Sequence, residues 1–586
     1  MNRILAAGTV LLVAAILLTG MSPLLVSPQR VRNAAVQQVR ELTGLQLDFS
    51  GEPEISFRPF LGVTLRNARI GAAEGGDAPL LQTDAIRMRI PVAAALTGAI
   101  DLRDVVLDRP RLRLVNGADG AGNWKLRAGR LRDLIDRAAA GRSAQANGTG
   151  LAAQAPAAIR LGAISIVDGS IERLGAEPFT LTGIDAAAAW PESGGPLTAA
   201  GEWDWRGQRF AFDWRIGQPV ALASGGVSKA GGSVTSQALR LEFRGDINLV
   251  ADLHFAGKVV ARSDSAEAVA RLLATGDSAG ATPLPVSISG TLDGMARNFE
   301  LRDAAITIGD QQARGALRFS AEPGKRPQVN ATLAFPKVAL PPLSGEAVGA
   351  ALTMSGGMDA DLRLSAPALS IGGFSASDVA AAVTVRNGVT KIDIGNAGFL
   401  DGALAAKLSI AQSGGDMKLD GKAELSGFSL ASAFAAAQPG GLSVSGKAKA
   451  QGTIRSSGRS YRDLLDSLQV AAALQVGAGS LGGIDLSPAA TKETQNAGGR
   501  IAAGGATPFV SLVAEIEADR RRMWIEQAVL KGEGLIARLS GSAHPGSGGL
   551  AIRIRSDEDQ RSGAGGLFVG GTLDQPVITR LPRGGD

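Results

Sequence analysis

One serine has the spacing of a hydrolase nucleophile. Gly276-Asp-Ser278-Ala-Gly280 fits the pattern G-x-S-x-G, in which a serine on a strand-to-helix turn attacks an ester or amide. Here a helix-like segment comes before the serine, and Pro283 and Pro285 prevent a helix after it. The sequence therefore predicts a chance match in a linker and no catalytic residue.

Other motifs for chemistry are weaker still. Gly441-x4-Gly446-Lys447-Ala448 approaches a phosphate-binding loop, but it lacks the serine or threonine that holds magnesium, and its middle residues favour a strand. The only histidines, His254 and His544, are far apart, and the chain has no cysteine, which excludes disulfides and thiolate metal sites. We therefore expect a protein that is not an enzyme, with no metal and no cofactor.

The charge of the chain is nearly balanced. Sixty basic residues face 55 acidic ones, a net charge of +5 over 586 residues, which predicts no nucleic-acid partner. Arg520, Arg521 and Arg522 form one short basic run. It fits a solvated strand or turn, or else a contact with a lipid headgroup or phosphate.

The segment from Ile4 to Val26 contains no charged residue. As a helix it would span roughly 34 Å, against a hydrocarbon core of about 30 Å. We predict a short cytoplasmic tail and a transmembrane helix over residues 1–26, with the body outside. The alternative is a cleaved signal peptide, but cleavage after Gly20 and Ser22 would fall before Pro23. Residues 27–44 are predicted to form an amphipathic helix.

From Leu45 onward, apolar and polar residues alternate with a period of two. Typical stretches are 86–90, 111–115, 239–243, 361–364, 391–394 and 551–554. Pairs that favour tight turns separate them: Asn116-Gly117, Asp168-Gly169, Asn387-Gly388, Asp401-Gly402 and Asp420-Gly421. The pattern predicts a mostly β fold, an elongated curled antiparallel sheet that is groove-like or sandwich-like, with short helices.

The β body divides at changes of composition. We expect an N-terminal β region over 45–142, a linker over 143–158, a middle β region over 159–360 with a short helix near 265–274, and a C-terminal β region over 361–586 with a mobile segment near 487–507. Further short helices are predicted at 129–140, 428–437 and 459–468. Trp203 and Trp205 should share one strand face, for core packing or for lipid or interface contact.

Two blocks of the sequence resemble the AsmA family of bacterial envelope proteins. The N-terminal block, roughly 1–130, has the apolar segment followed by the motifs LTGL (42–45), GEPEISFRPF (51–60), VTLRNARIG (63–71), LLQTD (80–84), VVLDRPRL (105–112) and DGAGNW (119–124). The C-terminal block, roughly 360–580, has FLDG (399–402), LSGF (425–428), YRDLLDSL (461–468) and LGGIDL (481–486). Between these blocks the resemblance is looser.

The resemblance implies an inner-membrane anchor and a periplasmic body. Family members are similar to bridge-like lipid-transfer proteins, whose sheets curl into an apolar-lined groove, and they are linked to outer-membrane biogenesis and lipid homeostasis. Lipid is then the expected ligand, and alanine and glycine would leave room for acyl chains. Candidate lipid-facing residues are Ile86, Met88, Ile90, Leu362, Leu364, Ile392 and Ile394.

Alternation alone does not separate a lipid groove from a closed sandwich. A second hypothesis is a periplasmic scaffold that assists the targeting and assembly of outer-membrane proteins, with sheet edges engaging its partners. Both hypotheses predict the same pattern of apolar and polar residues.

Overall fold

The chain forms two compact units in the computed structural model. Unit 1 comprises residues 1–264 and 288–296, and unit 2 comprises residues 265–287 and 297–586, whereas the sequence suggested a boundary at 360. The structure describes residues 28–56, 61–71, 79–90, 104–115, 122–124, 126, 128–147, 162–175, 178–250, 252–265, 268, 284–340, 358–371, 374–413, 416–436, 441–486, 500–501, 504–544, 546–562 and 566–581.

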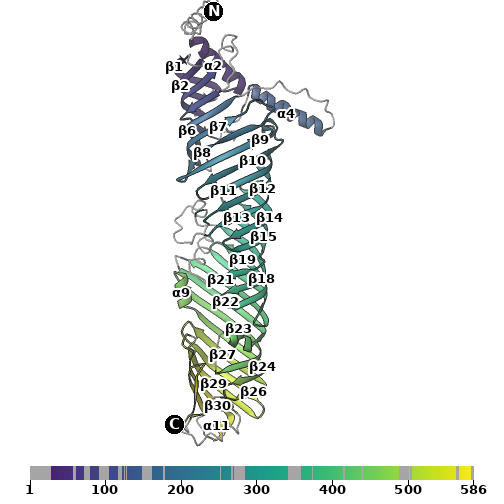
Figure 1. The fold of residues 1–586 in the computed structure, drawn as a ribbon, viewed down its shortest axis with the longest axis vertical. Helices are drawn as coiled ribbons and strands as arrows, with labels where there is room; N and C mark the ends of the chain where they lie inside the picture. The colour runs from purple at the N-terminus through teal and green to yellow at the C-terminus, as the bar shows by residue number, and fades with distance from the viewer. Residues whose placement is uncertain are drawn as a thin grey trace, which may run out of the picture. The chain divides into compact units, whose positions relative to one another are not determined.

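Strands make up most of unit 1 (Figure 1). They are β1 (Gln46–Ser56), β2 (Leu61–Gly71), β3 (Leu81–Ile90), β4 (Asp104–Asp108), β5 (Arg111–Leu114), β6 (Ala163–Arg173), β7 (Phe179–Ala189), β8 (Leu197–Trp205), β9 (Gln208–Ile216), β10 (Val227–Ser236), β11 (Arg240–Leu249), β12 (Leu253–Ser263) and β13 (Val286–Met295). From β1 to β12, successive strands pair antiparallel, except that β4 and β5 both pair with β3 and then lie parallel to β6. The sequence did not predict this parallel step.

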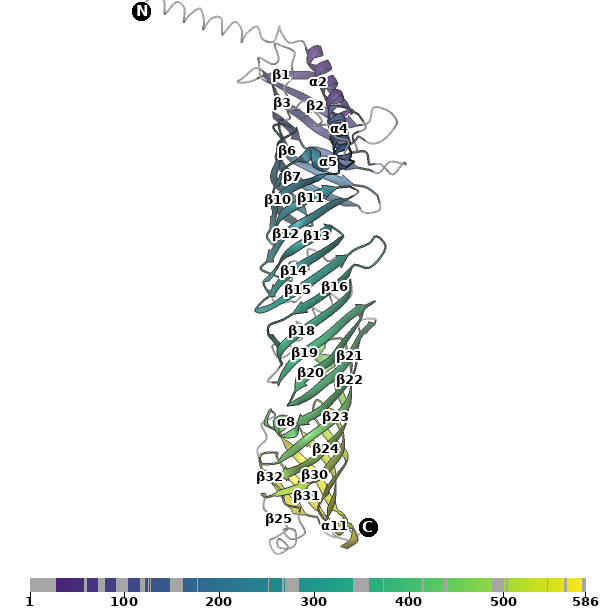
Figure 2. The ribbon, with the colours of Figure 1, turned by 90° about the vertical axis from the view of Figure 1, so that its right-hand side faces the viewer.

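Three helices lie on one side of the sheet of unit 1 (Figure 2). They are α2 (Pro28–Thr43), α4 (Arg130–Ala146) and α5 (Pro219–Ala223). The helix α2 packs on β1, which confirms the helix predicted over 27–44, and α4 touches both α2 and α5. The helix predicted over 129–140 is confirmed, but it continues to Ala146 and so takes up the start of the predicted linker.

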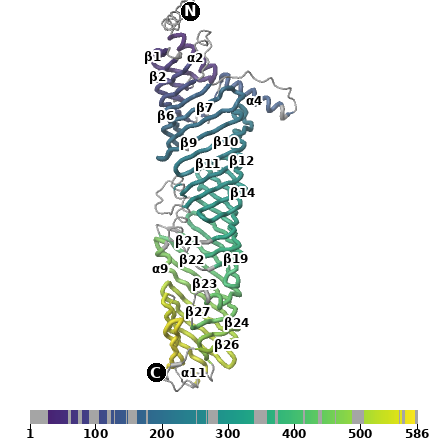
Figure 3. Tube along the Cα trace, in the orientation of Figure 1, coloured from purple at the N-terminus to yellow at the C-terminus, as the bar shows by residue number. Residues whose placement is uncertain are grey.

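Unit 2 is also built from strands, most of which pair with the next strand in the chain; β24 pairs with β26 and β27, and β25 pairs with β32 (Figure 3). They are β14 (Asn298–Ile308), β15 (Gln311–Ser320), β16 (Gln328–Ala334), β17 (Val338–Leu340), β18 (Asp359–Ile371), β19 (Phe374–Arg386), β20 (Val389–Phe399), β21 (Gly402–Ser413), β22 (Asp416–Ser429), β23 (Ser443–Gly458), β24 (Gln469–Gly482), β25 (Arg500–Ile501), β26 (Ala506–Phe509), β27 (Ser511–Asp519), β28 (Met523–Gly532), β29 (Leu535–His544), β30 (Gly549–Ser556), β31 (Leu567–Gly571) and β32 (Pro576–Arg580). A second parallel step joins β16 and β17 to β18.

Both units thus confirm a mostly β, antiparallel fold with short helices. In unit 2 the helices are α8 (Leu430–Ala436), α9 (Tyr461–Asp466) and α11 (Asp557–Ser562). The first two are slightly shorter than the helices predicted over 428–437 and 459–468.

The predicted turn pairs had mixed outcomes. Asn387-Gly388 forms the two-residue turn between β19 and β20, with both residues at positive φ, as a tight hairpin requires. In the Asp401-Gly402 pair, Asp401 lies in the turn after β20 and Gly402 begins β21. Two predictions were wrong: Asp168 lies at a bulge inside β6, and Asp420 lies inside β22. A bulge uses the same positive φ as a turn, so the pair alone does not distinguish them.

The last strands of unit 2 curl back onto β23. The N–H of Leu442, just before β23, donates to the carbonyl of Leu573 in the β31–β32 turn at 3.1 Å. The enclosed side chains form a large buried core that includes Leu530 and Ile578, each 1 % exposed. This end of unit 2 is therefore a closed, packed structure.

The prediction of a mobile segment near 487–507 was wrong at its C-terminal end. Residues 487–499 lie outside the described residues, but 500–501 form β25 and 506–507 belong to β26. The Thr507 hydroxyl donates to the carbonyl of Ile484 at 2.8 Å and accepts the N–H of Leu486 at 2.9 Å. These tertiary hydrogen bonds order a stretch whose composition suggested a loop.

Several other predictions fall outside the described residues. These are the transmembrane segment over 1–26, the Ser278 motif, most of the linker over 143–158 and nearly all of the helix near 265–274. Among the helices that the structure describes, none is long and apolar enough to span a bilayer.

Candidate functional site

Two rows of apolar side chains run across β18 to β23 on one face of the sheet of unit 2. Strand register places their members directly opposite one another from strand to strand. Row 1 is Leu362, Val383, Ile392, Leu408, Gly421 and Ile454, and row 2 is Leu364, Ala381, Ile394, Ala406, Ala423 and Gly452. Four of the predicted residues, Leu362, Leu364, Ile392 and Ile394, are thus brought together, and their contact with lipid stays a prediction.

The other members of the rows were not singled out from the sequence. Leu408 and Ile454 sit in strands with clear alternation, so that signal would have found them. Alternation does not single out Ala381 and Ala406, because they lie in runs of alanine such as Ala380-Ala381-Ala382, which have no period of two. Register, and not composition, identifies which of these alanines share a face.

The opposite face of the same strands is polar. Lys407, between Ala406 and Leu408, forms an ion pair with Asp393 at 3.4 Å, and Lys449 pairs with Glu424 at 2.9 Å. These groups are exposed to water, so they contribute solubility and little stability. The sheet here has one wet face and one apolar face.

The apolar face is incompletely covered along β18 to β23. All members of rows 1 and 2 are half-buried, and none belongs to a buried core cluster. A hollow of about 350 Å³ opens around Gly421, whose neighbours along row 1, Leu408 and Ile454, line it. Aliphatic side chains that stay partly open to water form the kind of surface that binds an apolar ligand or partner.

A third row shows where the open face ends. Leu404, Leu425, Ala450 and Leu474 are half-buried, and the register then continues through Ala514, Ala528, Leu539, Ile554 and Leu567. Ala514, Ala528, Ile554 and Leu567 are buried. The same face thus changes from open to packed as the last strands curl back.

In unit 1 the apolar face of β1 to β3 is covered by α2. Ile86 and Met88 are buried beneath α2, in a cluster with Val63 and Leu65. The helix, which the lining hypothesis did not take into account, occupies the space where a ligand would lie, so these two are corrected to core residues. Ile90 ends β3, and its side chain lies outside the described residues.

Aromatic side chains gather on β8 and β9. Trp203 and Trp205 do share a face, and both contact Phe210, with ring centroids 5.5 Å and 6.0 Å apart. Trp214 stacks on Phe243 at 6.1 Å in a second cluster. These rings pack against one another, but Trp203 and Trp205 stay half-buried, which fits core packing and lipid or interface contact alike.

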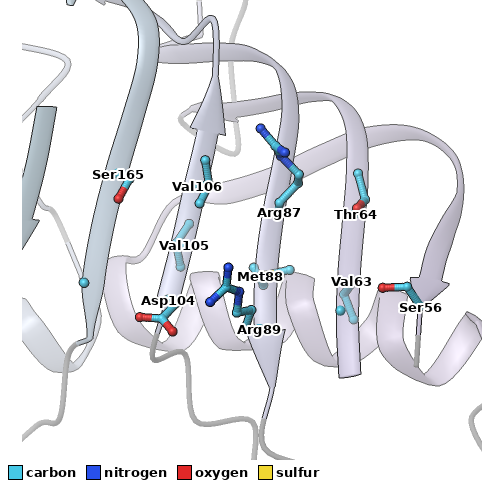
Figure 4. A pocket seen from close by; sticks show the side chains of 12 residues that line it. Ser56, Val63, Thr64, Arg87, Met88, Arg89, Asp104, Val105, Val106 and Ser165 are labelled. Atoms are coloured by element: carbon cyan, nitrogen blue, oxygen red, sulfur yellow. The ribbon is translucent and has the colours of Figure 1, made fainter. Parts of the chain in front are cut away.

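A polar hollow lies on the other face of unit 1 (Figure 4). It measures about 370 Å³, and β1, β2, β3, β4 and β6 contribute to it. Ser56, Thr64 and Arg89 line it, as does Arg87, which forms an ion pair with Asp108. Its lining thus combines these polar groups with Met88, Val105 and Val106.

One arginine on the polar face of unit 1 holds three carboxylates. Arg209 contacts Asp185, Glu202 and Asp204 at 2.9, 2.9 and 3.0 Å. The N–H of Asp168 donates to Asp185 at 3.0 Å, and this hydrogen bond together with Arg209 lowers the pKa of Asp185. Arg209 in turn has its own pKa raised by these acids.

This network predicts a specific acid titration. The folded pKa of Asp185 lies below the ordinary value of about 3.9. The ionised carboxylate therefore contributes to the free energy of unfolding above that value, and this contribution is lost as pH falls through the folded pKa. We expect a carboxyl-carbon NMR titration of Asp185 to have its midpoint below about 3.9, and Arg209→Gln to move it upward. An unshifted midpoint in both proteins would refute the network.

Two residues from the sequence motifs, Lys447 and His254, take part in contacts within the sheet. Lys447, from the near match to a phosphate loop, lies in β23 and donates to the carbonyl of Asp401 at 3.2 Å. His254 in β12 contacts Asp293 at 3.1 Å. In the ranges that the structure describes, no three acidic or histidine side chains gather as metal ligands.

Comparison with known proteins bears on the N-terminal part of the chain. The model of the AsmA family matches residues 1–200. The N-terminal third of the chain is therefore similar to AsmA-family proteins. This similarity suggests association with the cell envelope and fits a sheet with one apolar face. The match ends at residue 200, so the AsmA-like character of residues 360–580 stays a prediction. No curated protein matches the chain significantly.

Proposed function

We propose that this protein is a non-enzymatic envelope protein that binds or conducts lipids between the inner and outer membranes. An N-terminal helix over residues 1–26 would anchor it in the inner membrane, with the body in the periplasm. By this route it would contribute to outer-membrane biogenesis and lipid homeostasis. The observation that carries the proposal is the continuous, half-buried apolar face across β18 to β23.

The energetic argument favours a hydrocarbon ligand. Burying apolar surface contributes roughly 25 cal/mol per Å², and this face leaves aliphatic side chains partly in water. An acyl chain can cover such a surface without needing hydrogen bonds. Leu408 and Ile454 lack polar atoms on their side chains, so they would select for apolar character and not for a particular headgroup.

The dimensions of row 2 also suit an acyl chain. Four of its six members are alanine or glycine, between row 1 and the larger Leu404 and Leu425 of the next row. Side chains two apart on a strand are about 6.6 Å apart, which makes row 2 a shallow furrow. Six strands extend it over about 24 Å, beyond the roughly 15 Å of one membrane leaflet.

Site-specific photocrosslinking tests the proposal. A photoreactive residue at Ile392, on the apolar face, is expected to form lipid adducts in cells, whereas the same residue at Lys391, on the opposite face of β20, should form few. Mass spectrometry of the purified protein identifies the adducts. Equal lipid labelling at the two positions, or no lipid labelling at Ile392, would contradict the proposal.

The scaffold alternative receives no specific support from the described sheet edges. On the outer side of β32, β25 pairs with two residues, with Ile501 opposite Ile578. The first strand, β1, is bulged at two places and carries Pro53 and Glu54, features that disfavour the addition of another strand. The photocrosslinking experiment also bears on this alternative, because a scaffold that binds its partners at sheet edges predicts no lipid adducts at Ile392.

A further inference from the structure

Three arginines surround a second hollow in unit 2, at the ends of its strands. Its volume is about 670 Å³, and it lies between the C-terminal end of α9 and the turn that joins β27 to β28. Arg462 comes from α9, and Arg520 and Arg521 come from the turn. Figure 1 shows α9 beside the sheet, where it touches β22 and β23.

The turn that carries two of the arginines is held by its own backbone. One carboxylate oxygen of Asp519 accepts the N–H groups of Arg521 and Arg522, each at 2.7 Å, and these bonds lower the pKa of Asp519. Arg522 points elsewhere, because its guanidinium lies over the ring of Trp524, 5.6 Å from its centre. The basic run therefore forms a turn, and this conformation agrees with both interpretations of the sequence, a solvated turn and a phosphate contact.

The helix that carries Arg462 is fixed at both ends. Ser460 caps its start, since the Ser460 hydroxyl accepts the N–H of Asp463 at 3.2 Å and the Asp463 carboxylate accepts the N–H of Ser460 at 2.9 Å. After the helix, the Ser467 hydroxyl donates to the carbonyl of Ser457 in β23 at 2.6 Å. The backbone positions of the three arginines are thus set by hydrogen bonds before any ligand binds.

The hollow has more positive than negative charge. Asp466 forms an ion pair with Arg520, and Asp519 accepts the backbone N–H groups of the turn. The guanidinium groups of Arg462 and Arg521 form no hydrogen bond or ion pair with a described residue, although the charge of Arg521 also acts on Asp519. Planar guanidinium groups bind phosphate through paired hydrogen bonds, and two on facing elements can grip one group from both sides.

The hollow also adjoins the apolar face. The helix α9, which carries Arg462, is bound to the apolar side of β23: Ser456 lies two residues after Ile454, on the same face, and its hydroxyl donates to the carbonyl of Leu464 in α9 at 2.5 Å. A molecule with a phosphate in the hollow could therefore place a hydrocarbon chain on the rows. We infer that Arg462, Arg520 and Arg521 form an anion site at the edge of the apolar face, which takes a phosphate group. That the phosphate belongs to a lipid headgroup rests on the proposed function.

The test uses the full-length, delipidated protein in a maltoside detergent, which contains no phosphorus. Phosphorus NMR then follows two probes, inorganic phosphate and a short-chain phosphatidylglycerol. The double variant Arg462→Gln/Arg521→Gln removes two positive charges and leaves the ion pair between Arg520 and Asp466 in place. The matched control, Arg363→Gln/Arg553→Gln, removes two exposed arginines from the polar face of β18 and β30.

We expect the double variant to bind at least one probe about tenfold more weakly than wild type, with the control unchanged and with binding that weakens as salt rises. Arginine-dependent binding of both probes indicates a general phosphate site, and of phosphatidylglycerol alone a headgroup site. Equal binding by wild type and the double variant, or an equal loss in the control, overturns the inference. Circular dichroism of each variant checks that it is folded.

The two proposals fail separately in this design. Arginine-dependent binding of inorganic phosphate without any lipid binding supports the anion site and counts against the proposed function. Lipid binding that is equally strong in wild type and the double variant supports the proposed function and counts against the anion site.

Discussion

Leu530→Ala is expected to lower the free energy of unfolding of the last strands of unit 2 by about 2–5 kcal/mol. Leu530 lies in β28 opposite Leu512 and Ala537, and its side chain is 1 % exposed. Shortening it leaves a cavity in a region that the curled strands enclose from several sides. The loss in the free energy of unfolding therefore has two parts, the burial of apolar surface that is lost and the cavity that stays unfilled.

The matched substitution is Leu408→Ala on the open face. The Leu408 side chain is half-buried, so the same change should cost about 1 kcal/mol or less. Hydrogen exchange of amides in β28 and β21 measures the two effects locally, which avoids assuming that the whole chain unfolds in one step. Similar losses at both positions would contradict the distinction between a packed end and an open face.

Ala406→Lys is expected to reduce lipid bound to the purified protein about tenfold or more. Ala406 belongs to row 2, flanked by Ile394 and Ala423 on the neighbouring strands. An ammonium group placed in the furrow would lose hydration when a hydrocarbon chain covered it, so the chain would be excluded. Lipid extraction followed by mass spectrometry quantifies what remains bound.

The adjacent residue supplies the control. Ala405 has the same side chain and similar burial, but it faces the polar side of β21, opposite Glu424. Ala405→Lys adds the same charge one residue away and should leave the lipid content unchanged. If both variants lose lipid equally, the loss comes from charge or misfolding, and the apolar face is not the binding surface.

The pattern of residues was sufficient for the strand character and for part of the candidate surface. Alternation at 361–364 and 391–394 identified residues that do share one face, because side chains on a strand point alternately to its two sides whatever the tertiary context. The helix at 28–43 was found for the same kind of reason, since its apolar residues recur with helical spacing.

Whether an apolar face is open or covered depended on contacts between residues distant in the sequence. Ile86 and Leu408 have the same alternating surroundings, yet α2 covers Ile86, while Leu408 lines an open hollow. Likewise, the hydrogen bond from Leu442 to Leu573 joins segments more than a hundred residues apart. Local periodicity records only which side of the strand is apolar. What lies against that side is decided by how the chain returns, so only the tertiary structure separates the packed end of unit 2 from the open face across β18 to β23.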